Sequence, residues 1–145
     1  MLLSTRSRYG LKMMFELAIS YGKGPISLKD IAKRQSLSVT YLEQLVAPLR
    51  REGLVHSIRG AQGGYELSRE PISISVGEVI RILEGSLAAS DCIEEGNHEC
   101  QKAGCCATRK VWEKITNSIY DVIDNTSLQD MVNDYNEMNP VPENI

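Results

Sequence analysis

The sequence lacks any apolar run of about 18 residues, the length that a membrane-spanning helix needs. Its start, "MLLSTRSRYG", lacks the apolar stretch of a secretory signal, because an arginine already stands at position 6. Internal repeats and low-complexity tracts are absent as well. These absences predict a cytoplasmic protein without membrane contact, and its 145 residues are enough to bury a core.

Histidine is scarce, since His56 and His98 are the only two in the chain. With histidines so far apart, no Ser/His/Asp arrangement can be assembled, and no paired-carboxylate site is visible. We therefore expect a protein that is not an enzyme.

Charge is unevenly distributed along the chain. Residues 1–70 contain eleven lysines and arginines against six acidic residues, a net charge of +5. Residues 71–145 contain five against thirteen, a net charge of −8. A basic half joined to an acidic half indicates nucleic-acid contact by the first half, although solvated surface charge gives the same imbalance.

Hydrophobic spacing predicts a mainly α-helical fold with one small β-hairpin. Apolar residues recur at helical intervals over residues 6–21, 28–34, 39–51, 76–84, 108–124 and 127–135. Pro48 should kink the third of these helices or end its regular part, because proline has no backbone N–H. The runs "LVHSIRG" and "GGYELSR" have the character of strands joined by a glycine-rich turn. Helix, short helix, helix and hairpin in this order predict a winged helix-turn-helix domain over residues 1–84.

The start of the third helix would then face the major groove of DNA. Its polar residues there are Ser38, Thr40, Tyr41, Glu43 and Gln44. Gln44 can pair with adenine and Glu43 can accept a hydrogen bond from cytosine, whereas Tyr41 and the hydroxyls suit phosphates. Ser38 or Thr40 can cap this helix, the latter together with Glu43, and in the alternative interpretation Glu43 is only such a capping residue.

The tip of the hairpin carries Arg59 beside Gly60. An arginine on a narrow loop suits the minor groove, where the negative potential attracts a guanidinium group. Alternatively, the glycines serve only the turn and Arg59 is a solvated charge.

All four cysteines fall within residues 91–110, at positions 92, 100, 105 and 106. In a cytoplasmic protein, such a group is more typical of a metal or redox site than of a disulfide framework. The spacing differs from that of common zinc sites and of ferredoxins. Because consecutive side chains diverge, Cys105 and Cys106 should not both bind one metal ion. Three thiolates with an exchangeable fourth ligand favour a sensing site.

Several segments together resemble the iron–sulfur cluster regulator IscR and its relatives NsrR and CymR. They are "SRYGLKMMFELA", "SLKDIAKRQSLSVTYLEQL", "LRREGLVHSIRGAQGGYELSR", "ISVGEVIRILEG" and the C-x7-C-x5-C spacing before "TRKVWEKI". The resemblance extends from residue 1 to about residue 135. It implies a homodimer on palindromic operator DNA, with Ser38, Thr40, Tyr41, Glu43 and Gln44 in the major groove and Arg59 and Gly60 at the minor groove.

The resemblance also implies an iron–sulfur cluster whose presence changes which operators are bound, with Glu43 as the discriminating residue. Cys92, Cys100 and Cys106 match the three cysteine ligands, and a 2Fe–2S cluster is favoured over 4Fe–4S. The implied division is a cluster-binding loop over residues 85–107, a dimerisation helix and a short helix over 108–135, and a flexible tail over 136–145.

The chain departs from this pattern at the fourth ligand. Arg109 stands where IscR-like proteins have histidine, and a cationic guanidinium does not coordinate iron. NsrR-like relatives use an aspartate of the partner subunit near the N-terminus, where this chain has Arg8. The remaining candidates are Cys105, His98, Glu95, Glu99 and a small molecule.

The sequence therefore predicts a dimeric transcription regulator whose operator binding responds to an iron–sulfur cluster. The first alternative is a cluster-free repressor of cysteine metabolism. It would sense oxidation at Cys105 and Cys106 or, like CymR relatives, the binding of a metabolic enzyme. A second alternative is a small redox protein, which would not bind operator DNA.

Overall fold

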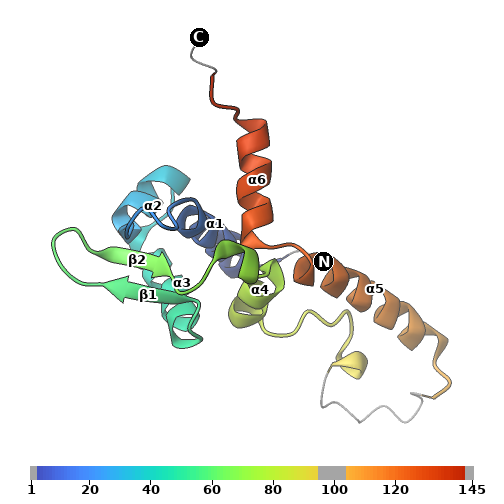
Figure 1. Ribbon diagram of the computed structural model, residues 1–145. Helices are drawn as coiled ribbons and strands as arrows, with labels where there is room; N and C mark the ends of the chain where they lie inside the picture. The colour runs from blue at the N-terminus through green and yellow to red at the C-terminus, as the bar shows by residue number, and fades with distance from the viewer. Residues whose placement is uncertain (1–2, 95–103, 143–145) are drawn as a thin grey trace.

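The computed structural model describes residues 3–94 and 104–142 and shows several helices and one hairpin (Figure 1). The helices are α1 (Thr5–Ile19), α2 (Leu28–Gln35), α3 (Val39–Arg51), α4 (Val76–Glu84), α5 (Ala107–Asp124) and α6 (Leu128–Met138). The strands are β1 (Val55–Ile58) and β2 (Gly64–Leu67), and short 3-10 turns lie at η1 (Pro71–Ser73) and η2 (Asp91–Ile93). The predicted helical fold with a hairpin wing is confirmed. Among the residues described, no helix is both long enough and apolar enough to cross a membrane.

Side chains from α1, α3 and α4 supply much of the core. Its fully buried members include Met13, Met14, Leu42, Leu45, Leu49 and Val79. Gly10 lets α1 approach α4 closely, because a Cβ at this position would collide with the side chain of Leu83. This packing holds the helix-turn-helix elements α2 and α3 on a rigid base.

Pro48 does not end α3, which continues to Arg51. Proline removes one hydrogen bond from a helix and crowds the carbonyl of the preceding turn. Leu45, Val46 and Leu49 around it are all buried, so core packing on one face of α3 supports the last turn.

The hairpin pairs β1 and β2 antiparallel, with Val55 opposite Leu67 and Ile58 opposite Gly64. Ile26, between α1 and α2, extends this sheet by pairing with Tyr65. A Cβ on Gly64 would collide with the backbone of Ile26, so only glycine fits at this crossing. The wing is therefore joined directly to the helix-turn-helix.

The junction between α5 and α6 is attached to the start of α4. The amide of Val76 donates to the carbonyl of Thr126 at 2.8 Å, and the amide of Leu128 donates to the carbonyl of Ile74 at 2.9 Å. The side chain of Leu128 is fully buried in the core of the winged domain. From this junction, α5 and α6 extend in different directions (Figure 1).

The predicted boundary of the tail, at residue 136, is wrong. Helix α6 continues to Met138, and the amide of Asn139 donates to the carbonyl of Tyr135 at 2.9 Å, closing a further turn. Residues 136–138 are all exposed, so the last turn of α6 lies in solvent rather than against the core.

Candidate nucleic-acid interface and cysteine site

The residues predicted to contact DNA lie at the start of α3. Ser38, Thr40, Glu43 and Gln44 are all exposed. The hydroxyl of Ser38 accepts a hydrogen bond from the amide of Tyr41 at 3.1 Å, and Ser38 is the residue that caps the helix. Its side chain is thus engaged by its own helix.

Tyr41 is turned toward α1 rather than fully outward. Its ring packs edge-on against Tyr9, with the ring centroids 5.9 Å apart, and its hydroxyl lies 3.3 Å from Oγ1 of Thr5. Arg8 and Lys12 lie over the same Tyr9 ring, at 5.9 and 5.5 Å from its centroid. The sequence reading missed this basic group beside α3, although its positions on α1 follow helical spacing.

The interpretation of Glu43 as a helix-capping residue is wrong. The cap belongs to Ser38, and the third residue of the helix is Tyr41, so Thr40 and Glu43 do not form a capping box. Within residues 3–94 and 104–142, the carboxylate of Glu43 has no hydrogen-bonding or ion-pair partner. It is available to an external donor.

At the wing tip, Arg59 and Gly60 are both exposed. Gly60 adopts a φ of 118°, and a Cβ on Gly63 would collide with the carbonyl of Ile58. The turn itself therefore requires these glycines. The resulting loop is narrow and presents Arg59 at the end of the hairpin.

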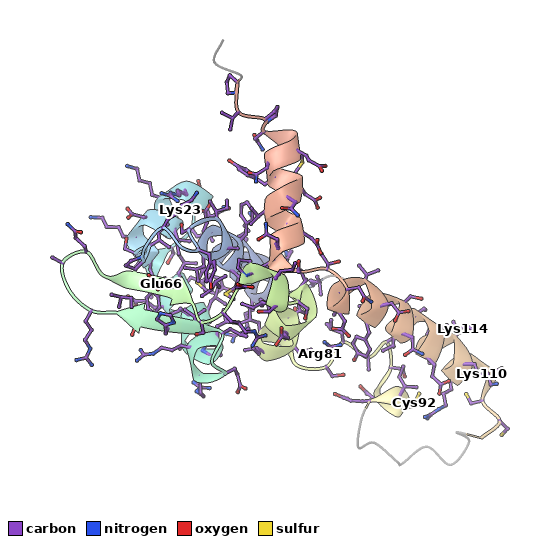
Figure 2. All side chains as sticks on the ribbon, in the orientation of Figure 1. Lys23, Glu66, Arg81, Cys92, Lys110 and Lys114 are labelled. Atoms are coloured by element: carbon purple, nitrogen blue, oxygen red, sulfur yellow. The ribbon has the colours of Figure 1, made fainter. Side chains whose placement is uncertain are left out.

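Two of the predicted cluster ligands lie near one end of α5. Cys106 immediately precedes this helix, and Cys92 lies in η2, which contacts α5. Figure 2 shows Cys92 beside the half of α5 from which Lys110 and Lys114 project. Glu95, His98, Glu99 and Cys100 lie outside the described residues, and among those described no three potential metal ligands come together.

The thiol of Cys106 is poised to ionise. Its Sγ lies 3.1 Å from Oγ1 of Thr108, and this hydrogen bond lowers its pKa below the usual value. The backbone N–H of Arg109, in the first turn of α5, contributes in the same direction. Because metals bind the thiolate rather than the thiol, this setting suits a ligand.

The family model named Rrf2, described as an iron-dependent transcriptional regulator, matches residues 3–134. The chain belongs to the Rrf2 family. It is 47% identical over 131 residues to the transcriptional regulator CymR of Bacillus subtilis, covering 90% of this chain and 89% of that protein. It is 37% identical over 139 residues to IscR of Pectobacterium atrosepticum, covering 96% of this chain and 84% of that protein.

Among solved structures, IscR of T. potens superposes with a TM-score of 0.80 and 48% sequence identity, covering 97% of this chain and 93% of that one. This Rrf2 protein is thus a DNA-binding transcription regulator and not an enzyme. Its relatives include both IscR and CymR, as the sequence motifs indicated.

In this Rrf2 chain, the residue at the expected histidine position makes defined contacts. Nη1 of Arg109 donates to the carbonyl of Cys92 at 2.6 Å, and its Nε donates to Oε1 of Glu113 at 3.0 Å. Sequence reasoning found only that Arg109 is no iron ligand. The contact between Arg109 and Glu113 could have been inferred from their spacing of four residues, which places both side chains on one face of a helix.

The apolar face of α5 divides into two parts. Ile119 and Ile123 pack against Val76, Ile80 and Leu87 of the same chain. Val111, Ile115 and Val122 remain 48%, 40% and 65% exposed. Packing within the subunit therefore explains only part of the hydrophobic pattern of α5.

Proposed function

We propose that this Rrf2 protein is a cytoplasmic, homodimeric regulator of the IscR type, whose operator binding responds to an iron–sulfur cluster held by Cys92, Cys100 and Cys106. One observation carries the proposal. The Arg109–Cys92 hydrogen bond ties one candidate ligand to the first turn of α5, which begins directly after another, Cys106.

The donors present fit such a cluster. Cys92 and Cys106 are half-buried thiols, and the pKa of Cys106 is lowered by the Thr108 hydroxyl. Thiolate ligation is what iron–sulfur clusters require. When bound, the cluster supplies redox-sensitive iron chemistry, and we favour 2Fe–2S over 4Fe–4S. The chain's own residues orient the two thiols, and the fourth ligand would come from a group other than Arg109.

On the DNA side, we assign major-groove contacts to Ser38, Thr40, Tyr41, Glu43 and Gln44, and minor-groove contacts to Arg59 and Gly60. The exposed side chains of Glu43 and Gln44 suit base edges. The hydroxyl of Tyr41 donates to Oγ1 of Thr5, and a phosphate contact by Tyr41 would replace this hydrogen bond with one to a phosphate oxygen. A palindromic operator would engage two such units.

A physical path connects the two sites. The N-terminal end of α5 contacts the Cys92 segment, and near its C-terminal end Asp124 accepts a hydrogen bond from Nη2 of Arg81 on α4 at 2.9 Å. The guanidinium of Arg81 lowers the pKa of Asp124, which keeps this carboxylate charged. Cluster binding that orders the cysteine-containing loop would thus act on the winged domain through α5. The coupling free energy between cluster binding and operator binding would be roughly 1–3 kcal/mol.

The cluster-free alternative also has a specific observation in its favour. Exposed Cys105 directly precedes Cys106, whose pKa is lowered, and low-pKa thiols oxidise readily. The similarity to CymR gives this alternative support equal to that of the IscR relatives. Iron and sulfide analysis of protein purified without oxygen separates the two, because the alternative predicts neither element.

The proposed function is tested by a gel shift on promoter DNA with cluster-loaded and cluster-free protein, under anaerobic conditions. We expect binding that weakens steeply with salt and differs between the two forms. Arg59→Ala should weaken operator binding about tenfold, equivalent to ~1.4 kcal/mol. Lys110→Ala removes the same charge far from the wing and should bind normally (Figure 2). Equal affinity of the loaded and cluster-free forms would contradict the proposal.

The homodimer is tested on α5. Ile115→Asp places a charge on the exposed apolar strip of Val111, Ile115 and Val122, and should weaken self-association roughly a hundredfold. Asn117→Asp adds the same charge at an exposed polar position two residues from Ile115, on a different side of α5, and serves as the control. Sedimentation equilibrium measures both. An Ile115→Asp protein that associates as tightly as the parent would rule out this face as the dimer contact.

A further inference from the structure

One guanidinium spans the space between α5 and the segment that carries Cys92. Nη1 of Arg109 reaches the Cys92 carbonyl at 2.6 Å, while Nε of the same group meets Glu113 at 3.0 Å. The side chain of Arg109 is only 24% exposed. These are charge-assisted hydrogen bonds in a partly shielded place, where they stabilise more than equivalent bonds on an open surface.

Apolar packing does little to hold η2 on α5. None of the residues of η2 is buried. Between the end of α4, the following loop and α5 lies a cavity of about 740 Å³, lined among others by Ala88, Ile93, Glu113 and Thr116. Leu87, near the start of the loop, is buried against α5, but none of residues 88–94 is buried, so the position of this later part depends on polar contacts.

In the described part of this loop, hydrogen bonds to α5 are seen at two places. The amide of Ala89 donates to Oγ1 of the buried Thr116 at 3.0 Å, three residues before Cys92. The second is the Arg109–Cys92 hydrogen bond. Thr116 fixes the beginning of the loop, and Arg109 fixes the part that carries the thiol.

The geometry requires arginine. Glu113, one turn further along α5, holds the planar guanidinium through Nε, so that Nη1 is aimed at the Cys92 carbonyl. Lysine has a single point charge on a flexible stem and cannot occupy both acceptors with this fixed geometry.

We propose that Arg109 is a positioning residue that holds the Cys92 segment at the start of α5 in the cluster-free protein. We call its hydrogen bond to the Cys92 carbonyl, supported by Glu113, the clasp. Two thiols, those of Cys92 and Cys106, are thereby held near the same end of one helix before any metal binds. Preorganised ligands spare the ordering entropy that binding would otherwise cost. The role in cluster retention rests on the proposed function, whereas the clasp itself does not.

The clasp is tested by hydrogen–deuterium exchange of the cluster-free, reduced full-length protein. In the parent, the amides of Ile93 and Glu94 donate to the carbonyls of Ser90 and Asp91 at 3.2 Å. Arg109→Ala should accelerate exchange over residues 89–94 roughly tenfold, because the charge-assisted bond that holds η2 is lost. Arg109→Lys should give a similar acceleration, since it cannot make both contacts.

Lys110→Ala is the matched control, because Lys110 is the exposed neighbour of Arg109 and its substitution removes the same positive charge. Exchange over α1 and α3 should be the same in all variants, which distinguishes release of the loop from unfolding. Unchanged exchange over residues 89–94 in Arg109→Ala would overturn the clasp. Acceleration by Lys110→Ala as well would also overturn it, because the effect would then be one of general charge.

A second readout addresses the cluster. Loaded Arg109→Ala protein should lose its visible absorbance to a chelator severalfold faster than the parent or Lys110→Ala. If Arg109→Ala shows faster hydrogen exchange but loses its cluster at the parent rate, the role of Arg109 in cluster retention is overturned. The clasp itself would still stand. If the parent never contains iron and sulfide, the proposed function fails, and the exchange experiment still decides the clasp.

Discussion

Anaerobically purified protein carrying Cys92→Ala should show no visible iron–sulfur absorbance, in contrast to the parent chain. In the proposed function, removing one of three thiolate ligands leaves two, which is too few to hold a cluster whose fourth ligand is exchangeable. The substitution should leave the fold intact, since Cys92 is only half-buried in a turn without buried residues. Absorption spectra together with iron and sulfide contents measure the loss. An unchanged spectrum would remove Cys92 from the ligand set.

The neighbouring pair Cys105 and Cys106 gives this prediction a matched control. Cys106→Ala should abolish the absorbance as Cys92→Ala does, because Cys106 keeps the family spacing and its pKa is lowered by Thr108. Cys105→Ala changes an exposed thiol one position away and should retain the cluster if the fourth ligand comes from elsewhere. If Cys105→Ala loses the cluster absorbance and Cys106→Ala keeps it, Cys105 and not Cys106 is the ligand.

Periodicity and capping in the sequence were enough to predict most of the elements. The sequence "SVGE" at residues 75–78, for example, has the pattern of a capping box and predicts a helix start there. Helix α4 begins at this place, with both hydrogen bonds between Ser75 and Glu78 formed. Such contacts join residues three positions apart, so the local sequence contains all the information that they need. The apolar stripe of α3 likewise marks four buried residues, Leu42, Leu45, Val46 and Leu49, although its first member, Val39, is 38% exposed.

Contacts between distant segments could not be predicted in this way. The spacing around Tyr41 indicates an exposed helix start, but its pairing with Tyr9 depends on how α1 crosses α3. The bond from Arg109 to Cys92 joins residues 17 positions apart, across a loop whose path no local rule determines. Resemblance to a family identified the position of Arg109 as unusual, and only the three-dimensional arrangement gives that arginine a partner.

Leu128 is the clearest case of a residue whose importance the local sequence concealed. Its segment, "SLQDMVNDY", predicts only a short terminal helix. In the structure, Leu128 is fully buried beside residues of α1 and η1, and its amide donates to Ile74. The side chain thereby anchors α6 and the end of α5 to the winged domain.

Leu128→Ala should therefore lower the free energy of unfolding by about 2–5 kcal/mol, the usual cost of emptying a fully buried leucine site. Chemical denaturation followed by circular dichroism measures the change. Met138→Ala provides the control on the same helix, because Met138 is 73% exposed and its removal should change stability by less than about 0.5 kcal/mol.

If α5 transmits cluster binding through this junction, Leu128→Ala should also reduce the difference in operator affinity between loaded and cluster-free protein. A variant destabilised as expected but with an undiminished affinity difference would show that the signal reaches the winged domain by another route, such as the Arg81–Asp124 pair.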